Sequence, residues 1–140
     1  MSGTLHELRP KAVDSEKVSI NLGFVDLGQI DLLVQEGFYS NRSDFIRTAI
    51  RNQLDRHNDA VKQSVVRYQL ELGLRHIDRH YLDSLRASGT SLDIQVLGLV
   101  VIADDVSPEL ALATISSLHV LGAVQASPAV KAALRDRMRP

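Results

Sequence analysis

The most regular pattern of apolar and polar positions lies near the N-terminus. Between Lys17 and Leu22 every second residue is apolar, which is the period of a strand with one buried and one exposed face. Gly23 ends the alternation. The predicted buried face consists of Val18, Ile20 and Leu22, and the predicted exposed face consists of Lys17, Ser19 and Asn21.

Two amphipathic helices are predicted after this strand, because apolar residues then recur every three or four positions. Asp26 is a suitable N-cap for the first helix, and Gly37 is placed to end it. Ser40 or Ser43 is expected to cap the second helix. The apolar face of the second helix is predicted to hold Phe45, Ile46, Ala49, Ile50 and Leu54.

The predicted strand has no partner within its own domain, and an exposed strand edge needs one. A domain of about 40 residues is also too small to bury a sufficient core. We therefore expect two chains to pair their strands as a ribbon in a homodimer. The expected dimer core consists of Val18, Ile20, Leu22, Phe45, Ile46 and Ile50.

Residues 58–87 are predicted to form two helices or one bent helix, since their apolar residues follow two stripes that are offset near Gly73. This segment is expected to extend the dimer. His76 and His80 would share one face of such a helix, at a spacing that can hold a metal. Because no cysteine or well-placed acidic residue completes a site, we expect no metal there and an exposed pair that could touch DNA backbone.

A weak repeat with a period of 24 residues marks the C-terminal part, where the sequence Val-Leu-Gly-Leu-Val at 96–100 recurs as Val-Leu-Gly-Ala-Val at 120–124. A Ser-Pro pair, which starts helices well, follows each copy. The pattern predicts strand, helix, strand and helix over about 92–102, 107–116, 118–125 and 128–138. Two repeats cannot close a core, so we expect this module to join dimers or to sense a ligand. The expected assembly contacts are Leu97, Val100, Val120 and Val124.

Composition narrows the possible functions of the chain. Its 140 residues are 44% hydrophobic, which favours one or two small folded domains. The absence of cysteine excludes a disulfide framework and cysteine catalysis. No catalytic pair and no phosphate-binding glycine loop is recognisable, so we expect neither an enzyme nor a cofactor. With no signal peptide and no apolar run near 20 residues, we expect a cytoplasmic, nucleoid-associated protein without a membrane partner.

Three stretches resemble the ribbon-helix-helix DNA-binding family of the MetJ/Arc/CopG type. They are residues 17–22, residues 30–33, and residues 37–50 with their Ser-Asn-Arg-Ser-Asp-Phe-Ile-Arg run. The resemblance covers about residues 16–57 and implies an intertwined dimer whose antiparallel ribbon enters the major groove of double-stranded DNA. One departure is that many members begin the first helix with a proline, whereas this chain has Gly23-Phe24-Val25-Asp26.

The resemblance also assigns residues to the DNA interface. Lys17, Ser19 and Asn21 match the base-reading positions, and their side chains can bond to base edges. The helix start at Ser40, Asn41, Arg42 and Ser43 matches the phosphate-binding positions. Residues 17–60 hold five basic and six acidic side chains, so one dimer is expected to bind weakly. The basic excess in 61–90 or side-by-side dimers would then strengthen binding.

The sequence therefore predicts a mainly α protein with short strands. It would comprise a flexible arm (1–15), a ribbon-helix-helix domain (16–57), a helical dimer-extending segment (58–89) and a C-terminal β-α-β-α oligomerisation or sensing module (90–140). The leading function is a homodimeric, sequence-specific DNA-binding protein, a transcriptional repressor. An unidentified effector or protein is a further expected partner. The alternatives are an antitoxin of a toxin–antitoxin pair, and a self-assembling adaptor for DNA partition or scaffolding.

Overall fold

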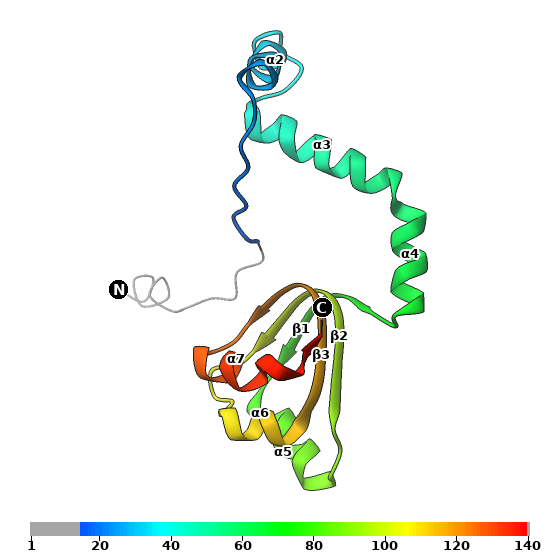
Figure 1. Cartoon of the computed structure of the whole chain (residues 1–140), viewed down its shortest axis with the longest axis vertical. Helices are drawn as coiled ribbons and strands as arrows, with labels where there is room; N and C mark the ends of the chain where they lie inside the picture. Colours follow the sequence, from blue (N-terminus) through cyan, green and yellow to red (C-terminus); the bar gives the residue numbers. More distant parts are fainter. Residues whose placement is uncertain (1–14, 140) are drawn as a thin grey trace, which may run out of the picture. The chain divides into compact units, whose positions relative to one another are not determined.

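The computed structural model describes residues 15–139, which fall into two compact units, 15–64 and 65–139 (Figure 1). The described residues form six helices and a four-stranded sheet. The prediction of a mainly α protein with short strands is therefore confirmed only in part, because the fold is a mixture of helices and strands and two of the strands have 11 residues each. Nearly all of the arm predicted at 1–15 lies outside the described residues. Within the described part, no helix is both long enough and apolar enough to cross a bilayer.

The first unit contains an extended N-terminal segment and the helices α2 (Phe24–Gln35) and α3 (Arg42–Arg56). Helix α2 starts after Gly23 rather than at Asp26, which lies in its first turn, where a carboxylate suits the helix dipole. Gly37 ends α2 as predicted, with φ of +88° and the Phe38 N–H donating to the Leu33 carbonyl at 3.0 Å. Asn41, rather than either serine, caps α3.

Helix α4 (Asn58–Arg67) follows α3 after one residue. The second unit is built on a sheet of parallel strands. Its strands are β1 (Glu71–Ile77), β2 (Leu92–Ile102), β3 (Ile115–Gln125) and the short β4 (Met138–Arg139), in that spatial order. Helix α5 (Arg79–Ser88) joins β1 to β2, and α6 (Pro108–Thr114) joins β2 to β3. Helix α7 (Pro128–Leu134) and a 3₁₀ turn (Arg135–Arg137) lead to β4.

The predicted helical segment at 58–87 was wrong in its centre, because β1 occupies 71–77. Strand β1 is a third copy of the repeat, since Gly73 pairs with Gly98 and Gly98 pairs with Gly122 in register. Glu71 and Arg75 stand where the other two copies have valine, and these charges concealed the repeat. As a result, the histidines at 76 and 80 belong to β1 and α5, respectively, rather than to one helix.

The core of the second unit lies between one face of the sheet and helices α5–α7 (Figure 1). Alternate residues of β2 supply the sheet side, and each helix contributes apolar residues opposite them. Ser107 and Ser127 cap α6 and α7, each followed by proline at the first helical position, as the sequence predicts. The buried residues of β2 and the helices include Ile94, Val96, Val100, Ile102, Leu82, Leu110, Val130 and Leu134.

This core corrects the predicted assembly contact at Val100. Val100 has no exposed surface, so it is unavailable to a second chain. Val120 and Val124 are partly buried against the same core. These three valines have even residue numbers and lie on the face of the sheet that packs against the helices. Leu97 lies on the opposite face of the sheet.

Candidate nucleic-acid interface

Residues 15–23 run extended into α2, and no strand partner accompanies them in the described chain. Lys17, Ser19 and Asn21 are exposed, as expected of residues that contact another molecule. The alternating Val18 and Ile20 are also exposed, by 78% and 64%. Two β-branched apolar side chains at alternate positions thus lie exposed on an extended segment, and these residue types favour strands.

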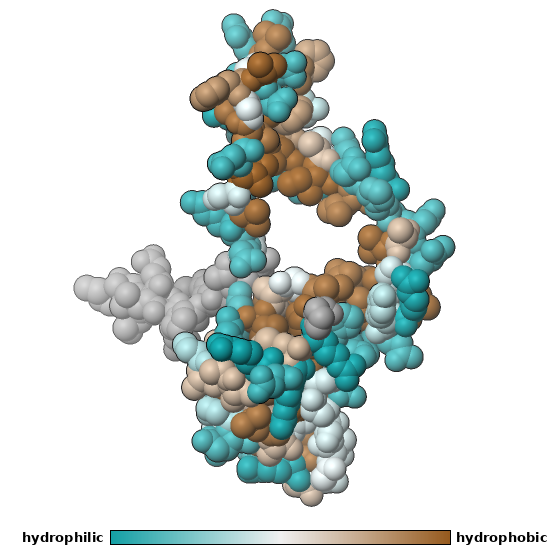
Figure 2. All heavy atoms as spheres, in the orientation of Figure 1, coloured by the Kyte–Doolittle hydropathy of each residue, from teal (hydrophilic) through white to brown (hydrophobic). Residues whose placement is uncertain are grey.

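An open apolar groove of about 410 Å³ lies beside this segment in the first unit. In Figure 2 the apolar side chains of this unit gather along one side of α3. The lining contains five of the six predicted dimer-core residues, and Val18 is the one outside it. The apolar lining residues are Ile20, Leu22, Ile30, Leu33, Phe45, Ile46, Ala49 and Ile50. The structure thus brings the predicted core residues together, but around a space that one chain leaves open.

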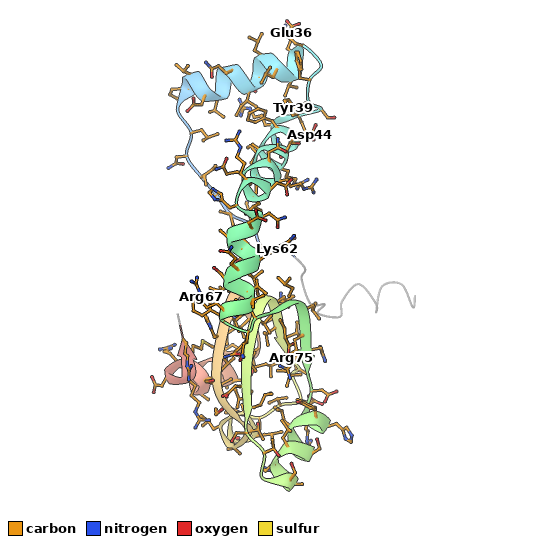
Figure 3. All side chains as sticks on the ribbon, turned by 90° about the vertical axis from the view of Figure 1, so that its right-hand side faces the viewer. Glu36, Tyr39, Asp44, Lys62, Arg67 and Arg75 are labelled. Carbon is orange, nitrogen blue, oxygen red and sulfur yellow. The ribbon has the colours of Figure 1, made fainter. Side chains whose placement is uncertain are left out.

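An ion pair joins α2 to α3, and an aromatic contact joins the connection between these helices to α3. The Arg42 guanidinium donates to both carboxylate oxygens of Asp31, through Nε and Nη2, each at 2.8 Å. The rings of Tyr39 and Phe45 meet edge to face with centroids 5.0 Å apart. Figure 3 shows Tyr39 and Asp44 close together where the α2–α3 connection enters α3. The ion pair therefore holds the start of α3 against α2, and the ring contact holds the connection against α3.

The Arg42–Asp31 pair changes the role expected of Arg42. Hydrogen bonding from the guanidinium lowers the pKa of the Asp31 carboxyl, and the same bond raises the pKa of Arg42. Both side chains are about half exposed, so water screens the attraction. No pattern in the sequence predicts this pair, because the residues are 11 positions apart and lie on different helices. The charge of Arg42, a residue expected to bind phosphate, is therefore shared with Asp31.

The start of α3 is stabilised by two side-chain hydrogen bonds. The Asn41 side chain accepts a hydrogen bond from the Asp44 N–H at 2.8 Å, and the Asp44 carboxylate accepts one from the Ser40 N–H at 2.9 Å. This arrangement is close to a capping box, except that the carboxylate binds the N–H of the residue before the N-cap instead of that of the N-cap. Of the free N–H groups at the helix start the N-cap side chain takes that of Asp44, and those of Arg42 and Ser43, the first two helical residues, are left.

The four predicted phosphate-binding residues therefore lie together at one helix start, where the N–H groups of Arg42 and Ser43 can face an anion. The Asp44 carboxylate at the same place opposes that anion. Further positive charge is exposed along α3 at Arg47 and Arg51, which take part in none of the ion pairs of the described residues. Within residues 15–139, no three acidic or histidine side chains gather as metal ligands would.

Residues 13–131 of the chain match the Ribbon-Helix-Helix transcriptional regulator family. The match extends over well more than half of the chain and includes most of the parallel sheet as well as the first unit. No curated protein and no solved structure matches the chain. The family match agrees with the extended segment and two helices of the first unit. The chain therefore belongs to the ribbon-helix-helix transcriptional regulator family.

Proposed function

We propose that the protein is a homodimeric transcriptional repressor that reads double-stranded DNA through a two-stranded antiparallel ribbon formed by residues 17–22 of two chains. The observation that carries this proposal is the exposed alternation of these residues beside an open apolar groove. A second chain would supply the missing strand partner and the missing cover at once. Regulators of this family bind DNA, which makes DNA the partner of the ribbon.

Dimer formation follows from the apolar surface that a single chain exposes. Val18, Ile20 and Ile50 are each more than half exposed, and burying such side chains contributes about 1.5–3 kcal/mol each. Pairing of the two extended segments would also satisfy their backbone N–H and C=O groups. The symmetry would be two-fold, since an antiparallel pair of identical strands is self-complementary.

The outer surface of the ribbon would present six polar side chains, three from each chain, to the bases. Lysine can donate to guanine O6 and N7, asparagine can form a bidentate pair with adenine, and serine can donate or accept. Lys17, Ser19 and Asn21 thus have the chemistry for direct reading in the major groove. Two-fold symmetry predicts a DNA site made of two related halves.

Phosphate contacts would come from the start of α3. The N–H groups of Arg42 and Ser43 would bind one phosphate on each side of the ribbon, assisted by the helix dipole. With Arg42 paired to Asp31 and Asp44 beside the site, this contact would orient the protein more than it would tighten binding. Bound over a promoter, such a dimer would act as a repressor by excluding polymerase.

The test is selection of duplexes from a random-sequence pool, with the mass of the protein measured by light scattering. We expect a dimer and a two-fold symmetric site bound at least about 10³-fold more tightly than unrelated DNA at physiological salt. Val18→Lys should abolish both dimer and binding. Val66→Lys is the matched control, because Val66 is 77% exposed on α4 while Val18 is 78% exposed. A monomeric parent, the absence of a preferred duplex, or equal behaviour of the two variants would contradict the proposal.

A further inference from the structure

The sheet of the second unit has one face that no helix covers in the described chain. Helices α5–α7 pack against the even-numbered residues of β2, so the odd-numbered residues point the other way. Two rows of apolar side chains cross this open face in register, from β1 through β2 to β3. The first row is Leu72, Leu97 and Leu121, and the second row is Leu74, Leu99 and Ala123.

These two rows form a patch without charged side chains. Leu72, Leu74 and Leu121 are exposed by 68%, 56% and 45%. Beyond the first row the register continues with the polar pair Gln95 and His119, and the His119 ring already meets Tyr68 edge to face. Parallel strands are rarely left uncovered, since both faces of such sheets are normally buried. The open face therefore has the composition of a surface that is covered in the working protein.

The size of the patch restricts what can cover it. Three strands about 4.8 Å apart, with two rows of residues about 6.6 Å apart, give a patch of roughly 14 by 13 Å. Two such patches in contact would bury on the order of 400 Å², whereas specific free partners bury about 1,200–2,000 Å². A separate protein would not be held by this face alone. This face could hold a partner that is already tethered nearby, at a millimolar effective concentration.

We propose that the open face packs against the same face of the second chain within one dimer. This inference rests on the proposed homodimer, which tethers two copies of the second unit. Because this face carries no charge, it does not select an oppositely charged partner. An apolar face of this kind is complementary to a second copy of itself. The central strand β2 carries Leu97 and Leu99 in the middle of the patch. The dimer would then be closed at two places, by the ribbon and by the two sheets.

The chain contains no cysteine, so a single introduced cysteine reports where two chains meet. The experiment uses the full-length protein with Leu97→Cys on the open face and, as matched control, Leu112→Cys, a leucine 40% exposed on α6. Each variant is treated with a bis-maleimide spanning about 10 Å, the distance between stacked sheets. We expect Leu97→Cys to give several-fold more covalent dimer than Leu112→Cys, with a yield that does not change on tenfold dilution.

Three results would overturn the inference, and they are distinguishable. A dimeric mass with equal cross-linking at both positions would show that the open face is not between the chains, while leaving the proposed ribbon dimer intact. A Leu97→Cys yield that falls with dilution would show contact between separate dimers instead. A monomeric mass for the parent protein would overturn both this inference and the proposed function.

Discussion

Gly98 lies so close to Gly73 in the neighbouring strand that a Cβ atom on Gly98 would be 2.1 Å from the Gly73 carbonyl oxygen. The same relationship recurs one strand further, where a Cβ on Gly122 would be 2.0 Å from the Gly98 carbonyl oxygen. All three glycines have positive φ, of +115°, +143° and +125° in chain order. The repeated glycine therefore marks one backbone conformation that each strand must adopt beside the next.

Gly98→Ala should destabilise the second unit by more than about 3 kcal/mol, because the methyl group meets backbone that cannot move aside and the φ value is strained for alanine. Urea denaturation followed by circular dichroism measures this. Gly28→Ala is the control, since Gly28 is inside α2 with no atom within 4 Å of its added Cβ. That change should stabilise the first unit by about 0.5–1 kcal/mol. Equal effects at the two positions would contradict the tight backbone approach.

Val100→Asp and Leu97→Asp should behave differently, although the residues are three positions apart on β2. Val100 is fully buried against the helices, so an unpaired carboxylate there should unfold the second unit, at a cost above about 3 kcal/mol. Leu97 lies on the open face, and its replacement should leave the unit folded. Thermal unfolding of both variants checks this. Unfolding by Leu97→Asp to the same degree would mean that the open face is part of the core.

Asp31→Asn should remove a contribution to stability that depends on pH. Because Arg42 lowers the pKa of Asp31 in the folded chain below the ordinary value of 3.8, the ion pair stabilises the fold above that value. The stabilisation is lost as the pH falls through the lower, folded pKa. We expect parent and variant to differ in urea midpoint at pH 7 and to converge near pH 2. Asp104→Asn, in the exposed turn after β2, is the control. A difference that persists at pH 2 would contradict the pairing.

The same Asp31→Asn change should tighten DNA binding to all sequences. It removes one negative charge per chain and releases the Arg42 guanidinium for phosphate. If each Arg42 of a dimer then gains one phosphate contact, the slope of log K against log salt should steepen by about 2. Anisotropy titrations over a range of salt concentrations measure the slope. An unchanged slope and affinity would mean that α3 does not begin next to the DNA backbone.

The helix starts at the two Ser-Pro pairs were readable from sequence because each depends on local chemistry. Ser107 and Ser127 cap their helices within a few residues, and β2 begins and ends at 92 and 102 as predicted. Gly37 likewise ends α2 because of its own backbone conformation, which has a positive φ. Local rules therefore placed most elements of both units within a few residues.

The elements that sequence reasoning missed depend on neighbours far along the chain. Strand β1 carries Glu71 and Arg75, four residues apart along the same strand. The Arg75 Nη1 atom lies 3.7 Å from the Glu71 Oε1 atom, so the two side chains form an ion pair. Figure 3 shows Arg75 among the side chains of the sheet. Residues four apart also lie on one face of a helix, where opposite charges pair favourably. The two charges were therefore equally compatible with the helix that the sequence predicted here. Only the register of Gly73 with Gly98 identifies the strand.

The partners of Arg42 and Val100 were missed for the same reason. Periodicity marks a residue as apolar or polar but does not say which face of a sheet it takes, and a one-residue shift exchanges the faces. The side of β2 that receives α5–α7 is fixed by the whole unit. Likewise, Asp31 meets Arg42 only after α2 and α3 have packed.

If the ribbon residues read the DNA, the triple variant Lys17→Ala, Ser19→Ala, Asn21→Ala should lose the parent's preference for its selected duplex. Its affinity for the selected duplex and for unrelated DNA is measured by anisotropy, with light scattering to establish that the variant is dimeric. Lys131→Ala, on α7, removes the same charge elsewhere and is the control. We expect the triple variant to lose at least about 10²-fold on the selected duplex and to bind both DNAs alike, since each base contact contributes about 1–3 kcal/mol. A dimeric triple variant that keeps the parent's selectivity would contradict the account.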